Sequence, residues 1–332
     1  MNSKLPYNFK NTDRKILIGK HDLPNPWINY LSNGRMHAFV SQAGGGMCWW
    51  RTTQNYRMTR YRFYNLPIDS PGFYVYIRMQ DGTVWSPTFR PCETKLDSWE
   101  AAHSTGYSQF SAEKDGIRAT LTLFMATDSD TLIWDLRLIN LKGEDVECDV
   151  FAYVEFSQLA FENEVKLGYY LKWNVDNHYD SDLDSIIYLY TSWLQIDTEK
   201  APLIYFSSSE KANSFCCNRD LFCGNYRDER NPIEIEKGVL SCQRELNRLV
   251  FILKKSGKLC NGLDGDDKAD LGFSALRCDI GFDLIFTDRH AIAVASDNGY
   301  AVFRDFKIKS HERRAGFILR NGENGLADQF FQ

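Results

Sequence analysis

Short runs of alternating apolar and polar residues, separated by turn residues, dominate this sequence. Residues 72–79 form one such run, which ends at Asp81-Gly82 and resumes at residues 83–85. An Asp-Gly pair between two alternating runs predicts a β-hairpin, because these residues tolerate the positive φ of a tight turn. A second Asp-Gly pair, Asp115-Gly116, precedes the alternating run at residues 117–125. The pattern therefore predicts antiparallel strands with tight connections.

Further strands are expected at residues 131–140 and 146–156, and shorter ones at residues 272–277, 282–286, 291–295 and 300–308. No capped helical pattern of ten or more residues occurs before residue 250. Residues 219–238 (RDLFCGNYRDERNPIEIEKG) are polar, aromatic and marked by Gly and Pro, which predicts a long ordered loop. We expect an all-β fold whose antiparallel meanders pack as a large sandwich.

Charge and hydropathy exclude several classes of protein. The net charge of -5 argues against a nucleic-acid partner. No apolar stretch is long enough to span a membrane, and the first twenty residues lack the apolar core of a signal peptide. The 9 cysteines are irregularly spaced, which favours free thiols in a reducing cytoplasm over disulfides or a zinc site. A cytoplasmic protein is therefore predicted.

Five strings in a fixed order carry a resemblance to a known family. They are residues 25–34 (NPWINYLSNG), 41–46 (SQAGGG), 59–69 (TRYRFYNLPID), 84–91 (VWSPTFRP) with 102–107 (AHSTGY), and 218–227 (NRDLFCGNYR) with Asn231-Pro232. Together they resemble the N-terminal β-supersandwich of glycoside hydrolase family 94, the cellobiose and chitobiose phosphorylases. The resemblance implies a galactose-mutarotase-like supersandwich over residues 1–253.

The family resemblance also implies a function. Its full-length enzymes cleave β-linked saccharides with inorganic phosphate and inversion, and no cofactor is expected beyond phosphate as co-substrate. Their general acid lies in an (α/α)6 barrel that follows the sandwich, whereas the sandwich supports that barrel, borders the sugar pocket and takes part in dimerisation. The residues after 253 are too few for such a barrel and read as strands. We therefore expect a non-catalytic domain that pairs with itself or with a barrel-bearing chain, and binds a β-linked oligosaccharide.

The C-terminal part is expected to differ from the family. Residues 254–271 are rich in Gly, Asp and Lys and read as a linker or surface loop, and residues 272–332 as a separate β segment. The ending of that segment at residues 299–308 is similar, more weakly, to the concanavalin-like sandwich of family 43 β-xylosidases. A second departure is residues 168–173 (GYYLKW), where Lys172 would stand in for an arginine of the cellobiose phosphorylases.

Candidate saccharide-binding residues follow from chemistry and position. Arg60 and Arg62 alternate around Tyr61, so both are expected on one strand face, where they bind sugar or phosphate oxygens or form a buried ion-pair network. Trp85 and Trp99 are the stacking candidates, because we expect the neighbouring turns to expose them. His103 binds saccharide or phosphate, or serves as a hydrogen-bonded structural residue.

Two other patterns have structural alternatives. Asp69, Asp97, Glu100 and Glu155 are the candidate carboxylates for hydrolysis, which needs two facing acids, although a strand carboxylate such as Glu155 is commonly the partner of an arginine. Gly44-Gly45-Gly46 precedes a predicted strand rather than a helix, so we expect close backbone packing instead of phosphate binding. A stand-alone glycoside hydrolase and a lectin-like binding module remain the alternative functions.

Overall fold

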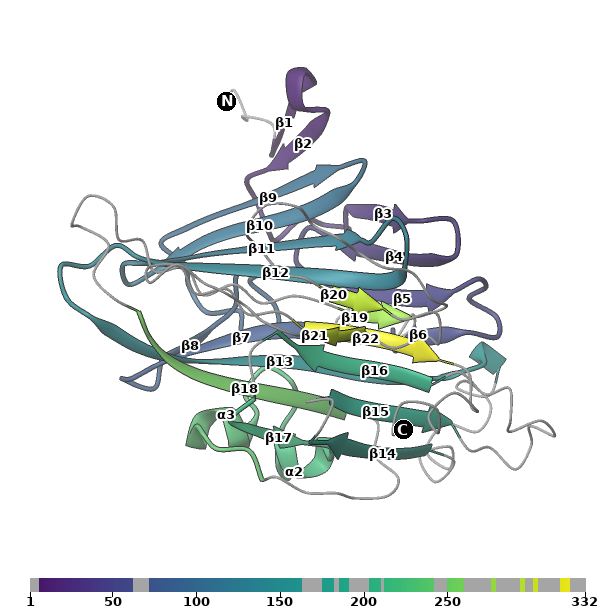
Figure 1. The fold of residues 1–332 in the computed structure, drawn as a ribbon. Helices are drawn as coiled ribbons and strands as arrows, with labels where there is room; N and C mark the ends of the chain where they lie inside the picture. The colour runs from purple at the N-terminus through teal and green to yellow at the C-terminus, as the bar shows by residue number, and fades with distance from the viewer. Residues whose placement is uncertain are drawn as a thin grey trace.

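Antiparallel strands make up nearly all of the regular structure in the computed structural model (Figure 1). The structure describes residues 6–61, 72–162, 175–181, 185–190, 203–209, 212–241 and 250–259, and short strands at 276–278, 293–295, 301–303 and 317–322. None of the helices in these ranges is long and apolar enough to cross a membrane.

An 11-stranded sheet forms one layer of the sandwich. Its strands, in spatial order, are β1 (Tyr7–Lys10), β2 (Lys15–Ile18), β9 (Ser98–Ser104), β10 (Tyr107–Lys114), β11 (Ile117–Met125), β12 (Asp130–Asn140), β19 (Leu276–Cys278), β16 (Leu203–Ser208), β15 (Ser185–Tyr190) and β14 (Val175–Asp180), with β22 (Phe317–Gly322) paired to β12 and β16. β9–β12 form a meander, in which Lys114 pairs with Ile117 and Ile117 with Asn140. Of the three consecutive strands predicted at residues 117–125, 131–140 and 146–156, the first two pair here as expected, but the third, β13 (Val146–Leu159), belongs to the other sheet.

A 9-stranded sheet forms the second layer. It contains β17 (Ser214–Cys216), β18 (Val250–Leu259), β13 (Val146–Leu159), β6 (Arg57–Thr59), β5 (Gly46–Trp50), β4 (Met36–Ser41) and β3 (Ile28–Ser32), while β7 (Phe73–Met79) pairs with β13 and β8 (Val84–Trp85). The short strands β20 (Ala293–Ala295) and β21 (Ala301–Phe303) form a separate hairpin.

The core lies between the two sheets and follows from strict alternation along the strands. In β11 the odd-numbered positions from Ile117 to Met125 are buried and the even ones are partly exposed. Trp134 of β12, with 1% of its surface exposed, contacts Phe73 of the opposite sheet at 5.1 Å between ring centroids. Burial of one face of each sheet supplies the main driving force for this fold.

Several local predictions are confirmed. β7 and β8 form the predicted hairpin around Gly82, which has a positive φ of 86°. Gly46 allows close backbone approach as expected, because a Cβ there would lie 2.2 Å from the Phe39 carbonyl oxygen. The all-β antiparallel prediction is also confirmed.

Other expectations need correction. The predicted loop at 219–238 contains two five-residue helices, α2 (Arg219–Cys223) and α3 (Ile233–Lys237). Arg60 does not belong to a strand, since β6 ends at Thr59. The strand predicted at 282–286 lies outside the described residues. The predicted boundary at 253 falls within β18, and the three-part division of the chain stays a prediction.

Candidate functional site

Glu155 is the centre of an ion-pair network on the outer face of the second sheet. Its carboxylate is buried, and Arg60 Nη1 lies 2.8 Å from one of its oxygens. The Tyr153 hydroxyl donates a hydrogen bond to the other oxygen at 3.2 Å. Arg219 Nε lies 3.8 Å from that same oxygen. Two cations thus hold a carboxylate that water does not reach.

Arg219 extends this network into the segment after β17. Its guanidinium donates to Glu229, so one arginine joins a strand of the sheet to the segment 212–241. Burial opposes the charge of Arg219, but the neighbouring Tyr153, Glu155 and Glu229 outweigh that cost and raise its pKa above the ordinary value. We call Arg60, Glu155, Arg219 and Glu229 the Glu155 clamp.

The segment 212–241 has a small core of its own beneath the clamp. Phe222 of α2 and Ile235 of α3 are buried against Tyr76 and Tyr153 of the sheet. Asn218 caps α2, because its side-chain oxygen accepts hydrogen bonds from the amides of Asp220 and Leu221. This segment is therefore packed in place, and it displays Tyr226 fully exposed to solvent.

Two of the four candidate carboxylates, Glu155 and Asp97, are held in structural roles, whereas Glu100 on β9 is exposed. Glu155 is engaged by the clamp, as the arginine-partner alternative expects. Asp97 accepts a hydrogen bond from the Asp115 amide and so fixes a turn. Asp69 lies outside the described residues. Glycoside hydrolysis needs two carboxyl groups free to act on the same bond, and these two residues do not provide such a pair.

Trp85 corrects the expectation of an exposed stacking face. Its side chain has 0% of its surface exposed and belongs to the core between the sheets. Trp99 is half-buried, with its indole N–H donating to the Pro87 carbonyl and its ring edge-on to His21. Trp99 can still offer part of its ring to a ligand, whereas Trp85 cannot.

Both ring nitrogens of His103 have hydrogen-bond partners inside the protein. Its Nε2 lies 3.2 Å from the Trp27 carbonyl oxygen and its Nδ1 lies 3.0 Å from Ser108 Oγ. Since a carbonyl only accepts, Nε2 carries the proton and Nδ1 accepts from the Ser108 hydroxyl. Desolvation lowers the pKa of His103 to about 4, so the ring is neutral at pH 7. Arg62 and Lys172, the remaining candidates, lie outside the described residues.

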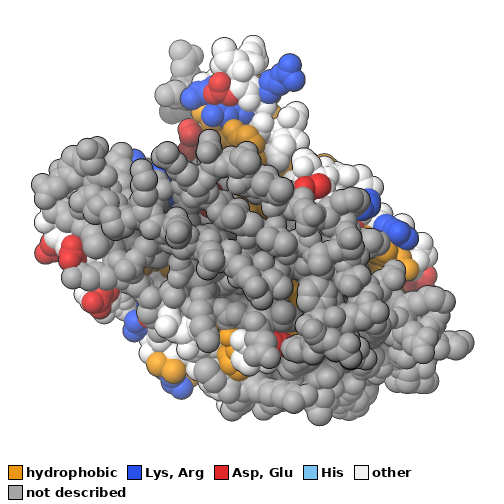
Figure 2. Space-filling view, in the orientation of Figure 1, with side chains coloured by type: hydrophobic (Ala, Val, Ile, Leu, Met, Phe, Trp, Pro, Cys, Tyr) orange, Lys and Arg blue, Asp and Glu red, His pale blue; other side chains and the backbone are white. Residues whose placement is uncertain are grey.

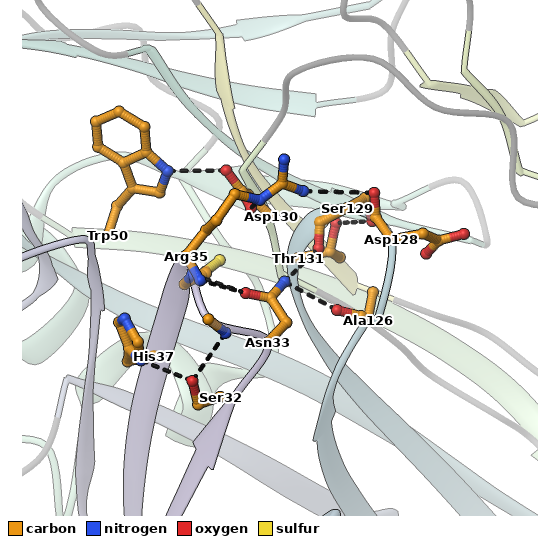
Figure 3. A network of polar contacts seen from close by, with 12 residues as sticks. Ser32, Asn33, Arg35, His37, Trp50, Ala126, Asp128, Ser129, Asp130 and Thr131 are labelled. Carbon is orange, nitrogen blue, oxygen red and sulfur yellow. Dashed lines mark hydrogen bonds and ion pairs between the residues drawn. The ribbon is translucent and has the colours of Figure 1, made fainter.

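A second polar network joins the β3–β4 turn and β5 of the second sheet to the start of β12 in the first sheet (Figure 3). The buried Asp130 at the start of β12 lies 2.8 Å from Arg35 Nε and accepts a hydrogen bond from the Trp50 indole at 2.8 Å. The Asn33 side chain donates to the carbonyls of Ala126 and Ser129. Both acceptor oxygens of Asp130 face protein groups, so this network secures the fold and offers no free acid.

The described residues provide neither a metal site nor a reactive thiol. No group of three or more His, Cys, Asp or Glu side chains in this part of the chain could hold a metal ion. Six cysteines in the same part are free thiols, and burial raises the pKa of several of them, including Cys216 to about 12. These thiols are poor nucleophiles at neutral pH.

The sequence matches the family model of the glycosyl hydrolase 94 supersandwich domain over residues 14–250. The chain belongs to glycoside hydrolase family 94. Its supersandwich contains both the Glu155 clamp and the network around Asp130. The similarity of the C-terminal segment to family 43 stays a prediction.

Relatives of this family 94 supersandwich are phosphorylases. N,N'-diacetylchitobiose phosphorylase of Vibrio furnissii is 30% identical over 234 residues, which is 69% of this chain and 28% of that protein. Solabiose phosphorylase of Paenibacillus borealis is 25% identical over 240 residues, covering 70% of this chain and 30% of that protein. The chain therefore spans less than a third of the length of these relatives.

One similar solved structure is that of a protein from Escherichia coli assigned as an aldose 1-epimerase. The alignment covers 76% of this chain and 97% of that chain, with 11% sequence identity and a TM-score of 0.37. So distant a likeness carries no conclusion about this protein.

The clamp residues Arg219 and Glu229 were not singled out from the sequence. Both lie in the segment read as a long loop, and Arg219 lies within one of the five family strings. Their shared partner Glu155 belongs to a distant strand, so only the tertiary structure shows the connection.

Proposed function

We propose that residues 14–250 are the non-catalytic sandwich of a glycoside phosphorylase. They would work beside a catalytic barrel, supplied by a longer form of the chain or by a partner chain, that cleaves a β-linked saccharide with inorganic phosphate. The family match over these residues is the observation that supports this proposal. Glu155 and Asp97, which are engaged in the fold, provide no general acid for the reaction.

The segment 212–241 is the part that we propose borders the saccharide. The Glu155 clamp and its buried aromatic residues hold this segment rigidly on the sheet. A rigid support keeps a displayed side chain in position, which lowers the entropic cost of binding. Tyr226, with its fully exposed ring, is the residue best placed for such a contact.

An activity assay tests the non-catalytic role. The purified chain is incubated with phosphate and either N,N'-diacetylchitobiose or cellobiose, and sugar 1-phosphate is measured. We expect no product above a boiled control. Turnover by this chain alone would show that the sandwich itself carries the chemistry.

A further inference from the structure

The hairpin of β1 and β2 projects from the body of the sandwich (Figure 1). Every residue at its tip, from position 8 to position 14, is exposed to solvent. Within its sheet β1 is the first strand in spatial order and pairs only with β2 among the described strands. We call residues 7–18 the arm. The arm can therefore reach a flat surface ahead of the two sheets.

Positive charge gathers at the tip of the arm, although the whole chain has a net charge of -5. Figure 2 shows basic side chains on this projecting hairpin. Lys10 is the cross-strand partner of Lys15, and like charges directly opposite each other destabilise a sheet. Asp13 offsets one of them, because it lies 3.2 Å from Lys15 Nζ. Lys10 and Arg14 form no ion pair with the described residues, so the tip has two cations available to an anionic partner.

Aromatic side chains lie beside these charges. Tyr7 and Phe9 alternate along β1 and share one face of the hairpin, whereas Lys10 belongs to the other face. Phe9 is 59% exposed, and its ring contacts that of Tyr7 at 5.5 Å between centroids. Trp27 continues this surface at the base of the arm, since its ring centroid lies 5.0 Å from that of Tyr7. One face of the arm is thus aromatic and the other is basic.

This arrangement has the chemistry of an interfacial membrane anchor. Tyr and Trp rings are enriched where a bilayer meets water, because each has an apolar body and a polar tip. Anionic headgroups attract Lys and Arg, whose apolar stems follow the boundary while their charges stay in water. A nucleic acid would instead need a long basic stripe, and an acidic protein would need a recess shaped to receive the hairpin. A bilayer requires only that the hairpin projects.

We propose that the arm binds the surface of a bilayer that contains anionic phospholipids. Lys10 and Arg14 contact the headgroups, while Phe9 enters the boundary between headgroups and acyl chains. The acidic body stays farther from the surface than the arm, so salt screens its repulsion more strongly, with a Debye length of about 8 Å at physiological ionic strength. The contact needs no spanning helix, since the arm lies in the interface and does not cross the bilayer.

Vesicle co-sedimentation of the full chain tests this proposal. Vesicles of equal parts phosphatidylglycerol and phosphatidylcholine are compared at low ionic strength with vesicles of phosphatidylcholine alone. We expect binding to the anionic vesicles only, and its loss in 1 M salt, where the Debye length falls to about 3 Å. Lys10→Glu with Arg14→Glu should raise the lipid concentration for half-maximal binding at least tenfold, because each basic side chain near an anionic surface contributes about fivefold.

A matched control separates the arm from the overall charge. Lys95→Glu with Lys237→Glu changes the net charge as much as the arm variant does, at exposed sites outside the arm. It should weaken binding much less than the arm variant. Circular dichroism of both variants checks that each is folded.

A tryptophan probe tests whether the tip enters the interface. In Phe9→Trp, the emission of the added indole should shift to shorter wavelength on anionic vesicles, because the ring leaves water. Val239→Trp places the same probe after α3, at a side chain that is 64% exposed, and should show no shift.

The proposal is overturned if the wild-type chain does not bind anionic vesicles at low salt, or if the arm variant binds as tightly as wild type. Equal weakening by the arm variant and the Lys95/Lys237 control also overturns it. So does binding of a soluble polyanion such as heparin with no shift of Phe9→Trp on vesicles, which would assign the arm to an acidic macromolecule. These measurements use no saccharide, so they stand or fall independently of the proposed sandwich role in phosphorolysis.

Discussion

His103 lies on β9 with both ring nitrogens engaged inside the protein. Its sequence context, between a tryptophan and a Gly-Tyr pair, was compatible with either ligand binding or a structural role. The neutral ring, which accepts from Ser108 and donates to Trp27, has the structural role. Protonation of Nδ1 would remove the acceptor that Ser108 requires.

The stability of the protein should therefore depend on His103 in mild acid. Burial lowers the pKa of His103 from 6.5 to about 4, so between these values the unfolded chain binds more protons than the folded one. With respect to this group, the protein is most stable above pH 6.5. As the pH falls toward 4, the free energy of unfolding decreases by about 3 kcal/mol in all.

Urea unfolding at a series of pH values measures this dependence. His103→Gln should flatten the slope of the free energy of unfolding between pH 6.5 and 4, whereas His37→Gln, at a partly exposed ring, should keep most of it. An unchanged slope in His103→Gln would place the acid sensitivity at another group.

The segment 212–241 shows how one element of the fold depends on a distant strand. Its two helices have five residues each, too short to be stable by themselves. Aromatic residues of β7 and β13 supply the surface on which they pack, and the Glu155 clamp supplies the charge contacts. The order of this segment is thus a tertiary property.

Glu155→Gln should release the segment. The change leaves Arg60 and Arg219 without their shared carboxylate, and breaking a buried pair is strongly destabilising. Because both arginines are partly exposed, we expect the free energy of unfolding to fall by about 2–3 kcal/mol, below the range for fully buried pairs. Amide hydrogen exchange in α2 and α3 should accelerate.

Glu147→Gln provides the matched control, since Glu147 is exposed on the same strand. It should change stability by less than about 0.5 kcal/mol. Equal effects of the two substitutions would argue against the clamp.

The whole molecule is held together by the core that the two sheets share. Trp134 of the first sheet contacts Phe73 of the second, and also Phe206 within its own sheet. Its indole N–H is buried with no hydrogen-bond partner in the described structure, so its contribution is packing alone. Loss of this ring should affect both sheets at once.

Trp134→Ala should lower the free energy of unfolding by about 3–5 kcal/mol, because it leaves a cavity between the sheets. Trp134→Phe should cost much less, since no hydrogen bond is lost and most of the ring volume remains. Thermal or chemical unfolding followed by circular dichroism measures both. A Phe variant as unstable as the Ala variant would indicate that the indole nitrogen has a partner after all.

The sequence by itself determined the strands and many of their turns. Alternation in residues 117–125 and the glycines at positions 82 and 116 follow from local rules, in which the backbone allows few conformations and one face must be buried. The five family strings predicted the supersandwich fold and the relationship of this chain to the phosphorylases. Tertiary structure alone decided which aromatic residues are exposed. Trp85 is an example, because turn residues flank it in the sequence but it is buried in the core between the sheets.

Tertiary structure also decided which charges meet. Arg60, Glu155 and Arg219 come from separate parts of the chain, and no local pattern couples them. Side-chain contacts between distant strands depend on how the sheets stack, and local periodicity does not contain that information.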